Sequence, residues 1–274
     1  MCSSFFRQSP AVFYYLFPFE SGDWGIFFRA SGDLLNPYSE VGFVNPPWVT
    51  LILAPFHLFP FRLAQALNAG TNFAIFYAIL FRRNAGLYAQ FLVFTSIPFL
   101  LLLVNGGIEW IPALGFLIGG APGVLLVAAK PQTGILGMLP EFTDRKAIIQ
   151  KGTFLLISGS LSFLIWPSWP MKLYINIRFM SENHIGLFNS VAPFPYLIPL
   201  GIFLLYYLLW KKPKNSNLLG IAATLCLIPY YTMHSLTLFI TYLSEHHRLA
   251  TIVWIILWIV ALFKWAIRTG VLNI

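Results

Sequence analysis

Long apolar runs separated by short polar stretches dominate the pattern along the chain. A membrane-spanning helix needs about 20 mainly apolar residues, and several runs approach that length. The runs cover residues 62–81, 88–104, 110–129, 152–166, 194–210, 217–234 and 249–265. The pattern therefore predicts an all-α protein, a polytopic membrane helix bundle of about seven spanning helices.

Two apolar stretches near the N-terminus do not fit a regular span. Residues 11–20 are too short to cross a membrane and contain Pro18, so we expect an interfacial segment or the remnant of a first span. Residues 46–60 contain several prolines, which break a regular helix, and predict a dipping or kinked entry into the next run. Because no internal repeat or linker divides the chain, we expect one integral membrane domain over 1–274.

Composition supports a lipid environment. Of the 274 residues, 58% are hydrophobic and 9% are charged, whereas about a quarter of the residues in a soluble domain are charged. The net charge of +8 comes from short basic clusters between apolar runs, as in cytoplasmic loops, and does not indicate nucleic-acid binding. Cys2 lies at the terminus and Cys226 inside an apolar run, so they predict neither a disulfide framework nor a metal site.

The loop charges predict an orientation. One set of loops is basic and contains Arg82, Arg83, Arg145, Lys146, Lys151, Lys211, Lys212, Lys214, Lys264 and Arg268. The other set is richer in acids and contains Glu20, Asp23, Asp33, Glu40, Glu109, Glu182 and Glu245. The positive-inside rule places the basic set in the cytoplasm. We therefore expect a multi-pass protein of the cell membrane with a cytoplasmic C-terminus and with Asp23 outside.

The first outer loop, residues 21–48, carries the most informative polar pattern. Ser21 is a good N-cap, and Asp23 follows in the first turn, where the helix dipole favours an anion. Apolar positions after it predict an amphipathic helix over 23–35 on the membrane surface, ended by Asn36 and Pro37. A carboxylate held there could act as a general base for a hydroxyl nucleophile. The alternative is that Asp23 only caps the helix.

Three motifs resemble those of a known enzyme family. The first is D-W-x-x-F-F-R-A-x-x-x-L-L-x-P-Y from Asp23, followed by N-P-P-W from Asn45. The second is the Lys-Pro motif of residues 124–140, and the third is the Pro-x-x-x-x-His-x-Leu element of residues 228–239. In this order they are similar to the GT-C glycosyltransferases, most of all to the polyprenyl-phosphate-mannose-dependent glycosyltransferase family 87. Asn45 stands where that family usually has Tyr.

This resemblance implies a function. GT-C enzymes transfer a sugar from a lipid-linked phosphate to an acceptor hydroxyl at the outer face, with inversion. By resemblance, Asp23 is the base that deprotonates the acceptor, and His234 lies near the donor phosphate or assists proton transfer. The partners implied are a polyprenyl-phosphate sugar of mannose type, a lipid or glycan acceptor and membrane lipids. No cofactor is expected beyond the lipid-linked sugar phosphate, and no metal.

The donor phosphate needs cations or hydrogen-bond donors. The candidates on the expected outer side are Arg29, Lys172, Arg178, His184, His246, His247 and Arg248, of which we select Arg29, Arg178 and Arg248. Lys130 matches the Lys-Pro motif but faces the cytoplasm in the expected topology. Either Lys130 is a snorkelling anchor, or the region 110–141 re-enters the membrane.

Several features have plainer interpretations. Glu109 lies in a short outer turn and is expected to be an exposed acid, although it could orient a sugar or a metal. Gly115, Gly119 and Gly123 fit close helix packing. Since the chain is short for a GT-C enzyme, a catalytically inactive GT-C-like subunit of a larger membrane assembly is the alternative to an active enzyme.

Overall fold

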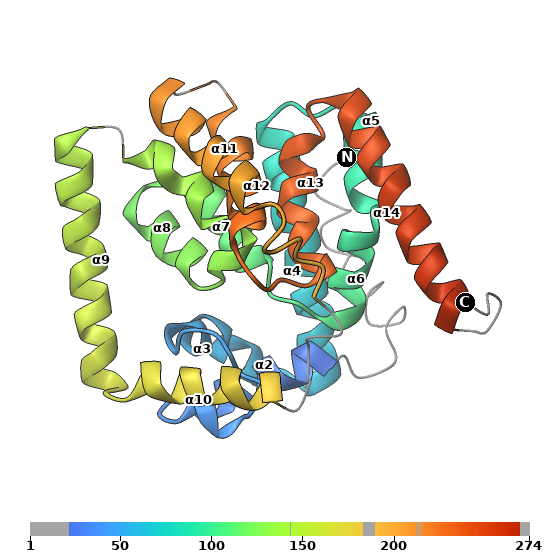
Figure 1. The fold of residues 1–274 in the computed structure, drawn as a ribbon. Helices are drawn as coiled ribbons and strands as arrows, with labels where there is room; N and C mark the ends of the chain where they lie inside the picture. The colour runs from blue at the N-terminus through green and yellow to red at the C-terminus, as the bar shows by residue number, and fades with distance from the viewer. Residues whose placement is uncertain (1–21, 143, 183–189, 212, 214, 269–274) are drawn as a thin grey trace.

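The computed structural model describes residues 22–142, 144–182, 190–211, 213 and 215–268. The described residues fold into α-helices and short 3-10 helices (Figure 1). The α-helices are α2 (Gly22–Gly32), α3 (Trp48–Leu53), α4 (Phe61–Arg82), α5 (Leu87–Phe94), α6 (Ile97–Asn105), α7 (Trp110–Ile118), α8 (Gly120–Ala128), α9 (Arg145–Ile165), α10 (Trp169–Glu182), α11 (Ile198–Lys211), α12 (Ser216–Leu227), α13 (Thr237–Leu243) and α14 (His247–Arg268). The 3-10 helices are η1 (Pro37–Ser39), η2 (Ala54–Leu58), η3 (Pro131–Thr133), η4 (Ile135–Glu141) and η6 (Met233–Leu236). The expectation of an all-α helix bundle is thus confirmed, and the interfacial segment expected at 11–20 lies outside the described residues.

Fewer of the described helices than expected are long enough to cross a membrane. By length and composition α4 and α9 qualify, and α5 with α6 would make a third span although the pair is bent by 52°. The bend falls where the Ser96 side chain accepts a hydrogen bond from the Phe99 backbone and starts α6 anew. The apolar window of α9 is only 6% buried, against 56% for α4. Such an exposed apolar helix is typical of a lipid-facing element.

The run at 110–129 is not one helix. Gly119 and Gly120 both have positive φ, at 66° and 64°, a conformation that glycine adopts without steric cost. The chain doubles back there, so α7 and α8 form a hairpin of two nine-residue helices. A helix of that length rises about 14 Å, less than half the apolar core of a bilayer. A single spanning helix at 110–129 is therefore wrong, and the doubled-back chain is compatible with the alternative that 110–141 re-enters the membrane, which stays a prediction.

Close packing holds the α7–α8 hairpin together. A Cβ added at Gly115 would lie 2.5 Å from the Gly123 carbonyl oxygen, and one at Gly123 would lie 2.5 Å from that of Gly115. The predicted packing role of these two glycines is confirmed, whereas Gly119 forms the turn. Because the hairpin doubles back, its two ends, at Glu109 and Lys130, come together.

The other expected runs also change in detail. The run at 217–234 contains α12, which ends at Leu227, and an extended stretch that leads to η6. The dipping or kinked entry expected at 46–60 consists of α3 and η2, which follow one another directly, and a break at Phe59 and Pro60 before α4; its placement in a membrane stays a prediction. The amphipathic helix expected over 23–35 is α2, which ends earlier, at Gly32.

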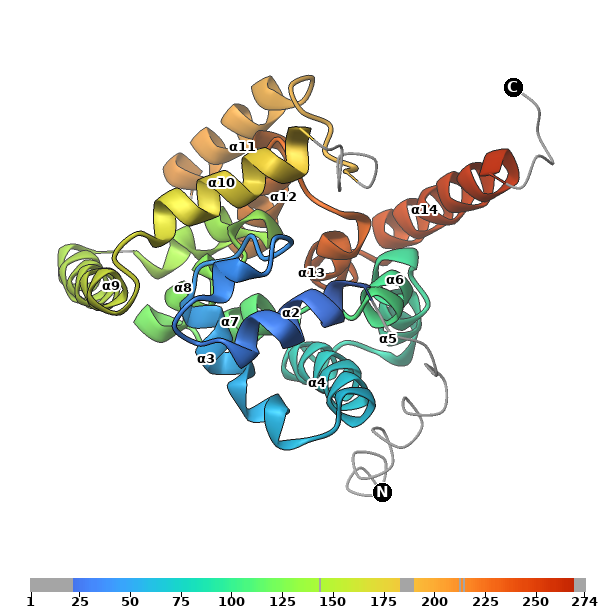
Figure 2. The ribbon, with the colours of Figure 1, turned by 90° about the horizontal axis from the view of Figure 1, so that it is seen from below.

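The molecule has two distinct ends. At one end, here called the α2 end, α2, α3 and α10 cross the ends of the longer helices (Figures 1 and 2). At the opposite end, here called the Arg83 end, Arg83 forms an ion pair of 2.6 Å with Glu245. Because the two charges touch, the expectation that Arg83 and Glu245 lie on opposite sides of the membrane is wrong.

Helix α14 starts at the Arg83 end and runs alongside α5. Tyr88 bonds Thr251 at 2.8 Å, and the indole of Trp254 donates to Thr95 at 3.2 Å. The contact later in α5 is also the contact later in α14, so the two helices are parallel. Helix α14 therefore runs from the Arg83 end toward the α2 end (Figure 1). The direction of α14 does not fit the loop assignment expected from the charges, which places Arg83 and the end of α14 on one side. The side of the membrane on which either end lies stays a prediction.

Candidate functional site

Helix α2 is fixed by its apolar face. Trp24 is fully buried and packs edge-on against Phe56 of η2, with ring centroids 5.2 Å apart. On the next turn the ring of Phe28 stacks on His57, whose Nε2 lies 2.7 Å from the Phe28 carbonyl oxygen. These contacts turn Asp23, in the first turn of α2, toward the loops at the α2 end. The Asp23 side chain remains 41% exposed.

Glu109 precedes α7 and is fully buried. Two asparagines one turn apart on α4 hold its loop: Asn72 donates to the Gly107 carbonyl at 2.9 Å and accepts from the Trp110 backbone at 3.0 Å. Asn68 accepts from the indole of Trp110 at 2.9 Å. The expectation of an exposed turn acid is therefore wrong, because α4 draws the loop inward by satisfying its backbone groups.

Lys130 follows α8 and is buried, with its ammonium paired to the carboxylate of Glu109. The first loop supports this end of α8, since Asn45 donates to the Ala129 carbonyl at 2.9 Å and Tyr38 donates to the Asn45 carbonyl at 2.8 Å. The α7–α8 hairpin thus brings Lys130 to the site of Asp23 rather than to the opposite end of the molecule. The expectation that Lys130 faces the cytoplasmic side away from Asp23 is wrong.

His234 completes the site from η6. Its Nε2 lies 3.7 Å from Oδ2 of Asp23 and 3.3 Å from Oε1 of Glu109. Thr232 lies closer still, with Oγ1 2.7 Å from the same nitrogen. The stretch before η6 is held by an isolated bridge between Ser190 and Thr232. We call Asp23, Glu109, Lys130 and His234 the charged centre.

The charged centre combines two carboxylates, an ammonium and an imidazole. Burial raises the pKa of Asp23, while the charges of His234 and Lys130 oppose this rise and Glu109 adds to it. A carboxylate with a raised pKa is a stronger base than a free aspartate. The arrangement can therefore accept a proton at Asp23 beside a cation, Lys130, that suits an anionic ligand.

The other predicted phosphate ligands lie elsewhere. Arg29 forms two hydrogen bonds of 2.9 Å with Glu40, and this pairing lowers the pKa of Glu40. Arg178 pairs with Glu182 at 2.6 Å on the exposed side of α10. Arg248 lies on the first turn of α14, at the Arg83 end (Figure 1). The contacts described for Arg29 and Arg178, and the position of Arg248, do not involve the charged centre.

The remaining basic candidates are also accounted for. Lys172 donates to the Asn36 side chain at 2.8 Å, and His246 bonds Asn215 at 2.8 Å. His247 lies beside Tyr88, at the start of α14, whereas His184 lies outside the described residues. Among the described residues, no group of three or more His, Cys, Asp or Glu side chains is placed to hold a metal ion.

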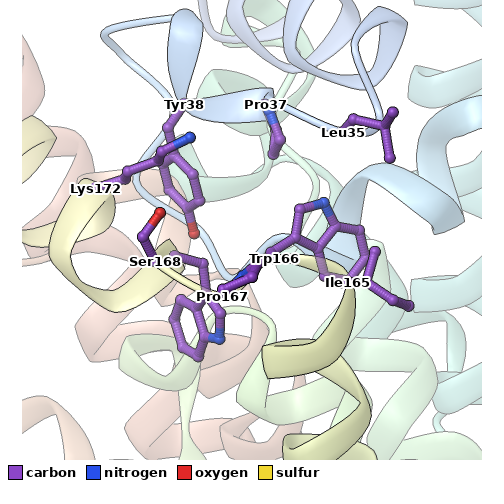
Figure 3. A pocket seen from close by; sticks show the side chains of 9 residues that line it. Leu35, Pro37, Tyr38, Ile165, Trp166, Pro167, Ser168 and Lys172 are labelled. Carbon is purple, nitrogen blue, oxygen red and sulfur yellow. The ribbon is translucent and has the colours of Figure 1, made fainter.

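Two pockets lie away from the charged centre. One, of about 50 Å³, lies between the first loop and the corner joining α9 to α10 (Figure 3). Its lining residues are Leu35, Pro37, Tyr38, Ile165, Trp166, Pro167, Ser168, Trp169 and Lys172. The other, of about 380 Å³, is lined by Tyr207, Pro213, Asn215, Leu218, Leu219, His246 and Leu249. Neither lining includes a residue of the charged centre.

Sequence reasoning missed the two asparagines that position Glu109. Asn68 and Asn72 lie four residues apart inside the apolar run at 62–81, so they share one face of α4. Two amides on one face of a spanning helix are costly unless they are bonded inside the bundle. This spacing was the available signal for a buried polar contact.

Comparisons with known proteins identify no relative of this chain: no family model, no curated protein and no solved structure matches it.

Proposed function

We propose that this protein is a multi-pass membrane glycosyltransferase of the GT-C type. It would transfer a mannose-like sugar from a polyprenyl phosphate to an acceptor hydroxyl, with inversion. The observation that carries the proposal is the 3.7 Å approach of Asp23 to His234. The resemblance to glycosyltransferase family 87 rests on the sequence and selects these two residues, and Lys130 of the same motif set lies beside them.

In this proposal each group of the charged centre has a role. Asp23 deprotonates the acceptor hydroxyl, because its raised pKa suits proton abstraction. Lys130 binds the donor phosphate, since a buried ammonium strongly favours an anion. His234 donates a hydrogen bond from Nε2 toward the reacting groups.

We also propose that the α2 end faces the extracytoplasmic side. The basic residues Arg82, Arg145 and Lys211 end or begin helices at the Arg83 end (Figure 1), and the positive-inside rule places such clusters in the cytoplasm. The charged centre at the α2 end would then meet lipid-linked donors from the outer face. In this orientation α14 runs outward from the cytoplasmic side.

A second candidate is an inactive GT-C-like subunit of a larger membrane assembly. Two observations favour it: Glu109 already neutralises Lys130, and the two pockets described above do not touch Asp23 or His234. A site whose charges satisfy one another can be purely structural. Only a transfer assay separates the two functions.

The test is sugar transfer by membranes containing the protein, with radiolabelled polyprenyl-phosphate sugars as donors. The variants are Asp23→Asn and, as a matched control, Asp33→Asn. Asp33 is exposed and accepts a hydrogen bond from the Asn36 backbone, which an asparagine can also accept. We expect transfer by wild type and Asp33→Asn, and none by inserted Asp23→Asn. No wild-type transfer from any donor would favour the inactive subunit.

A further inference from the structure

One oxygen of Glu109 connects most of the charged centre. Oε1 accepts a hydrogen bond from the ammonium of Lys130 and lies 3.3 Å from Nε2 of His234. The hydroxyl of Ser235 donates to the same oxygen at 3.5 Å. Glu109 therefore contacts the two groups to which the proposed function assigns the phosphate and the hydrogen bond, without being assigned a role itself.

The surroundings of His234 determine which ring nitrogen carries the proton. Nε2 faces Oδ2 of Asp23 at 3.7 Å and Oε1 of Glu109 at 3.3 Å. The closest partner of Nε2 is the Thr232 hydroxyl at 2.7 Å, which also lies 3.3 Å from the Ser235 hydroxyl. Because Ser235 donates to Glu109, Thr232 can donate to Ser235 and accept a hydrogen bond from Nε2. A bare nitrogen lone pair pointing at two carboxylates would be repelled, whereas an N–H group is attracted by both. The geometry thus favours the Nε2–H form, so that His234 acts through Nε2 as a donor and Asp23 remains the base.

Glu109 is held so that it cannot follow a departing partner. Its loop is bonded to Asn68 and Asn72 of α4, and its Oε2 is packed so tightly against Gly107 that a Cβ there would collide with it. Among the described residues Oε2 has no hydrogen-bond partner. A carboxylate fixed in this way acts as a stationary charge around which Lys130 and His234 are arranged.

We propose that Glu109 is a positioning residue of the charged centre, which keeps the proton of His234 on Nε2 and holds Lys130 ready for an anionic phosphate. When the donor phosphate binds, Lys130 exchanges Glu109 for the phosphate oxygens. Glu109 then stays behind as the acceptor for His234. The inference rests on the proposed function for its ligand, but not for the state of the imidazole.

The first test does not need turnover. Wild type, Glu109→Gln and Glu141→Gln are labelled with ¹⁵N-histidine, purified in lipid nanodiscs and compared by NMR; the His234→Gln spectrum identifies the signal of His234. Glu141 is the matched control because it is also paired with a lysine, Lys151, at 2.9 Å, at the tip of the same hairpin.

We expect His234 to be Nε2–H in wild type and Glu141→Gln, and to shift toward Nδ1–H in Glu109→Gln. A wild-type Nδ1–H form, or an unchanged signal in Glu109→Gln, would overturn the proposal.

The second test measures transfer. In Glu109→Gln we expect kcat to fall about 10- to 100-fold, as for a misplaced catalytic group, while KM for the donor is unchanged or lower because Lys130 no longer has a competing anion. The acid limb of the pH profile should move to lower pH, since Glu109 raises the pKa of Asp23. In Lys130→Met it should move to higher pH, since Lys130 lowers that pKa. If Glu109 had a merely structural role, the acid limbs of Glu109→Gln and Lys130→Met would not move in opposite directions.

The two tests separate the two proposals. If the NMR signal responds to Glu109→Gln but wild type transfers no sugar, the proposed function fails and Glu109 still sets the state of His234. If transfer is observed but Glu109→Gln matches Glu141→Gln in kcat and pH profile, the positioning role fails alone. If Glu109→Gln does not fold, the double variant Glu109→Gln with Lys130→Met replaces it, because it removes both charges of the pair. An Nε2–H signal of His234 in this double variant, as in wild type, would overturn the proposal.

Discussion

Nε2 of His234 lies 3.7 Å from Oδ2 of Asp23, although the two residues stand near opposite ends of the sequence. The contact exists because α2 packs Trp24 onto η2 while the bridge between Ser190 and Thr232 holds the stretch that leads into η6. A purely capping role for Asp23 would not need this contact. The proximity makes several consequences measurable.

The pH dependence of transfer should reflect Asp23. Burial raises its pKa and Glu109 adds to this rise, although His234 and Lys130 counteract part of the effect. A base works deprotonated, so activity is complete above the raised pKa and is lost as the pH falls through it. We expect the acid limb of kcat/KM above the range of a free aspartate, which titrates near about 3.9. A limb at or below that value would contradict Asp23 as the base.

The asparagines of α4 should matter for both stability and activity. Replacing Asn72 by Leu leaves the Trp110 amide without its acceptor and leaves the Gly107 carbonyl with Asn68 as its donor. A buried amide without a partner costs about 1–3 kcal/mol. We expect a lower melting temperature in nanodiscs and reduced transfer. Thr71→Ala, on the same helix, is the control, because the Thr71 hydroxyl donates back to the Leu67 carbonyl within α4 at 2.8 Å. Equal melting temperatures of Asn72→Leu and Thr71→Ala would show that Asn72 does not stabilise the Glu109 loop.

The resemblance selects Asp23, His234 and Lys130 by residue type and order, and the structure brings these three side chains together. Their roles stay predictions. The sequence did not allow the prediction of where Lys130 lies, because hydropathy treats 110–129 as one run. Two glycines with positive φ at its centre, Gly119 and Gly120, reverse the chain. A glycine in an apolar run is equally compatible with helix packing, which is why periodicity alone could not identify the turn.

The burial of Glu109 differs from the expectation for a related reason. A carboxylate between two apolar runs is usually exposed at the membrane surface. Here two amides four residues apart on α4 pull its loop inward, and Lys130 from the far end of the hairpin offsets its charge. Both partners are distant in sequence, so only the tertiary structure reveals that this acid is buried.

The hairpin itself gives a packing prediction. Gly115→Ala would place a methyl group 2.5 Å from the Gly123 carbonyl oxygen, and overpacking of this kind costs about 1–3 kcal/mol. As α7 and α8 separate, Glu109 and Lys130 at their ends move apart, so transfer should fall as well. Gly152→Ala on α9 is the control, since nothing lies within 4 Å of its Cβ position. We expect that control to match wild type in thermal melting and in transfer.

The corner between α9 and α10 should hold the first loop in place. Trp166 lies at this corner, beside the first loop (Figure 3), and its indole donates to the Leu34 carbonyl at 2.7 Å. Trp166→Phe keeps a ring but removes the donor, a loss of about 1 kcal/mol. We expect faster proteolysis between α2 and α3, whereas Trp210→Phe, at an exposed position 63% accessible on α11, should leave the rate unchanged. Equal cleavage rates in the two variants would show that the corner does not restrain the loop.

The arrangement of the two ends predicts which positions label together. Arg83 touches Glu245, so Gly86 and Arg248 belong to one end, whereas Asp33 follows α2 at the other. Single cysteines at Gly86, Arg248 and Asp33, in a background lacking Cys2 and Cys226, are treated with a membrane-impermeant maleimide in intact cells and in inverted vesicles. We expect the cysteine at Asp33 to react in intact cells, and those at Gly86 and Arg248 to react in inverted vesicles. If Gly86 and Arg248 label from opposite sides, the ion pair between Arg83 and Glu245 cannot exist in the membrane. If all three labels exchange sides together, the fold stands, but the charged centre would face the cytoplasm and the outer-face donor would have to be abandoned.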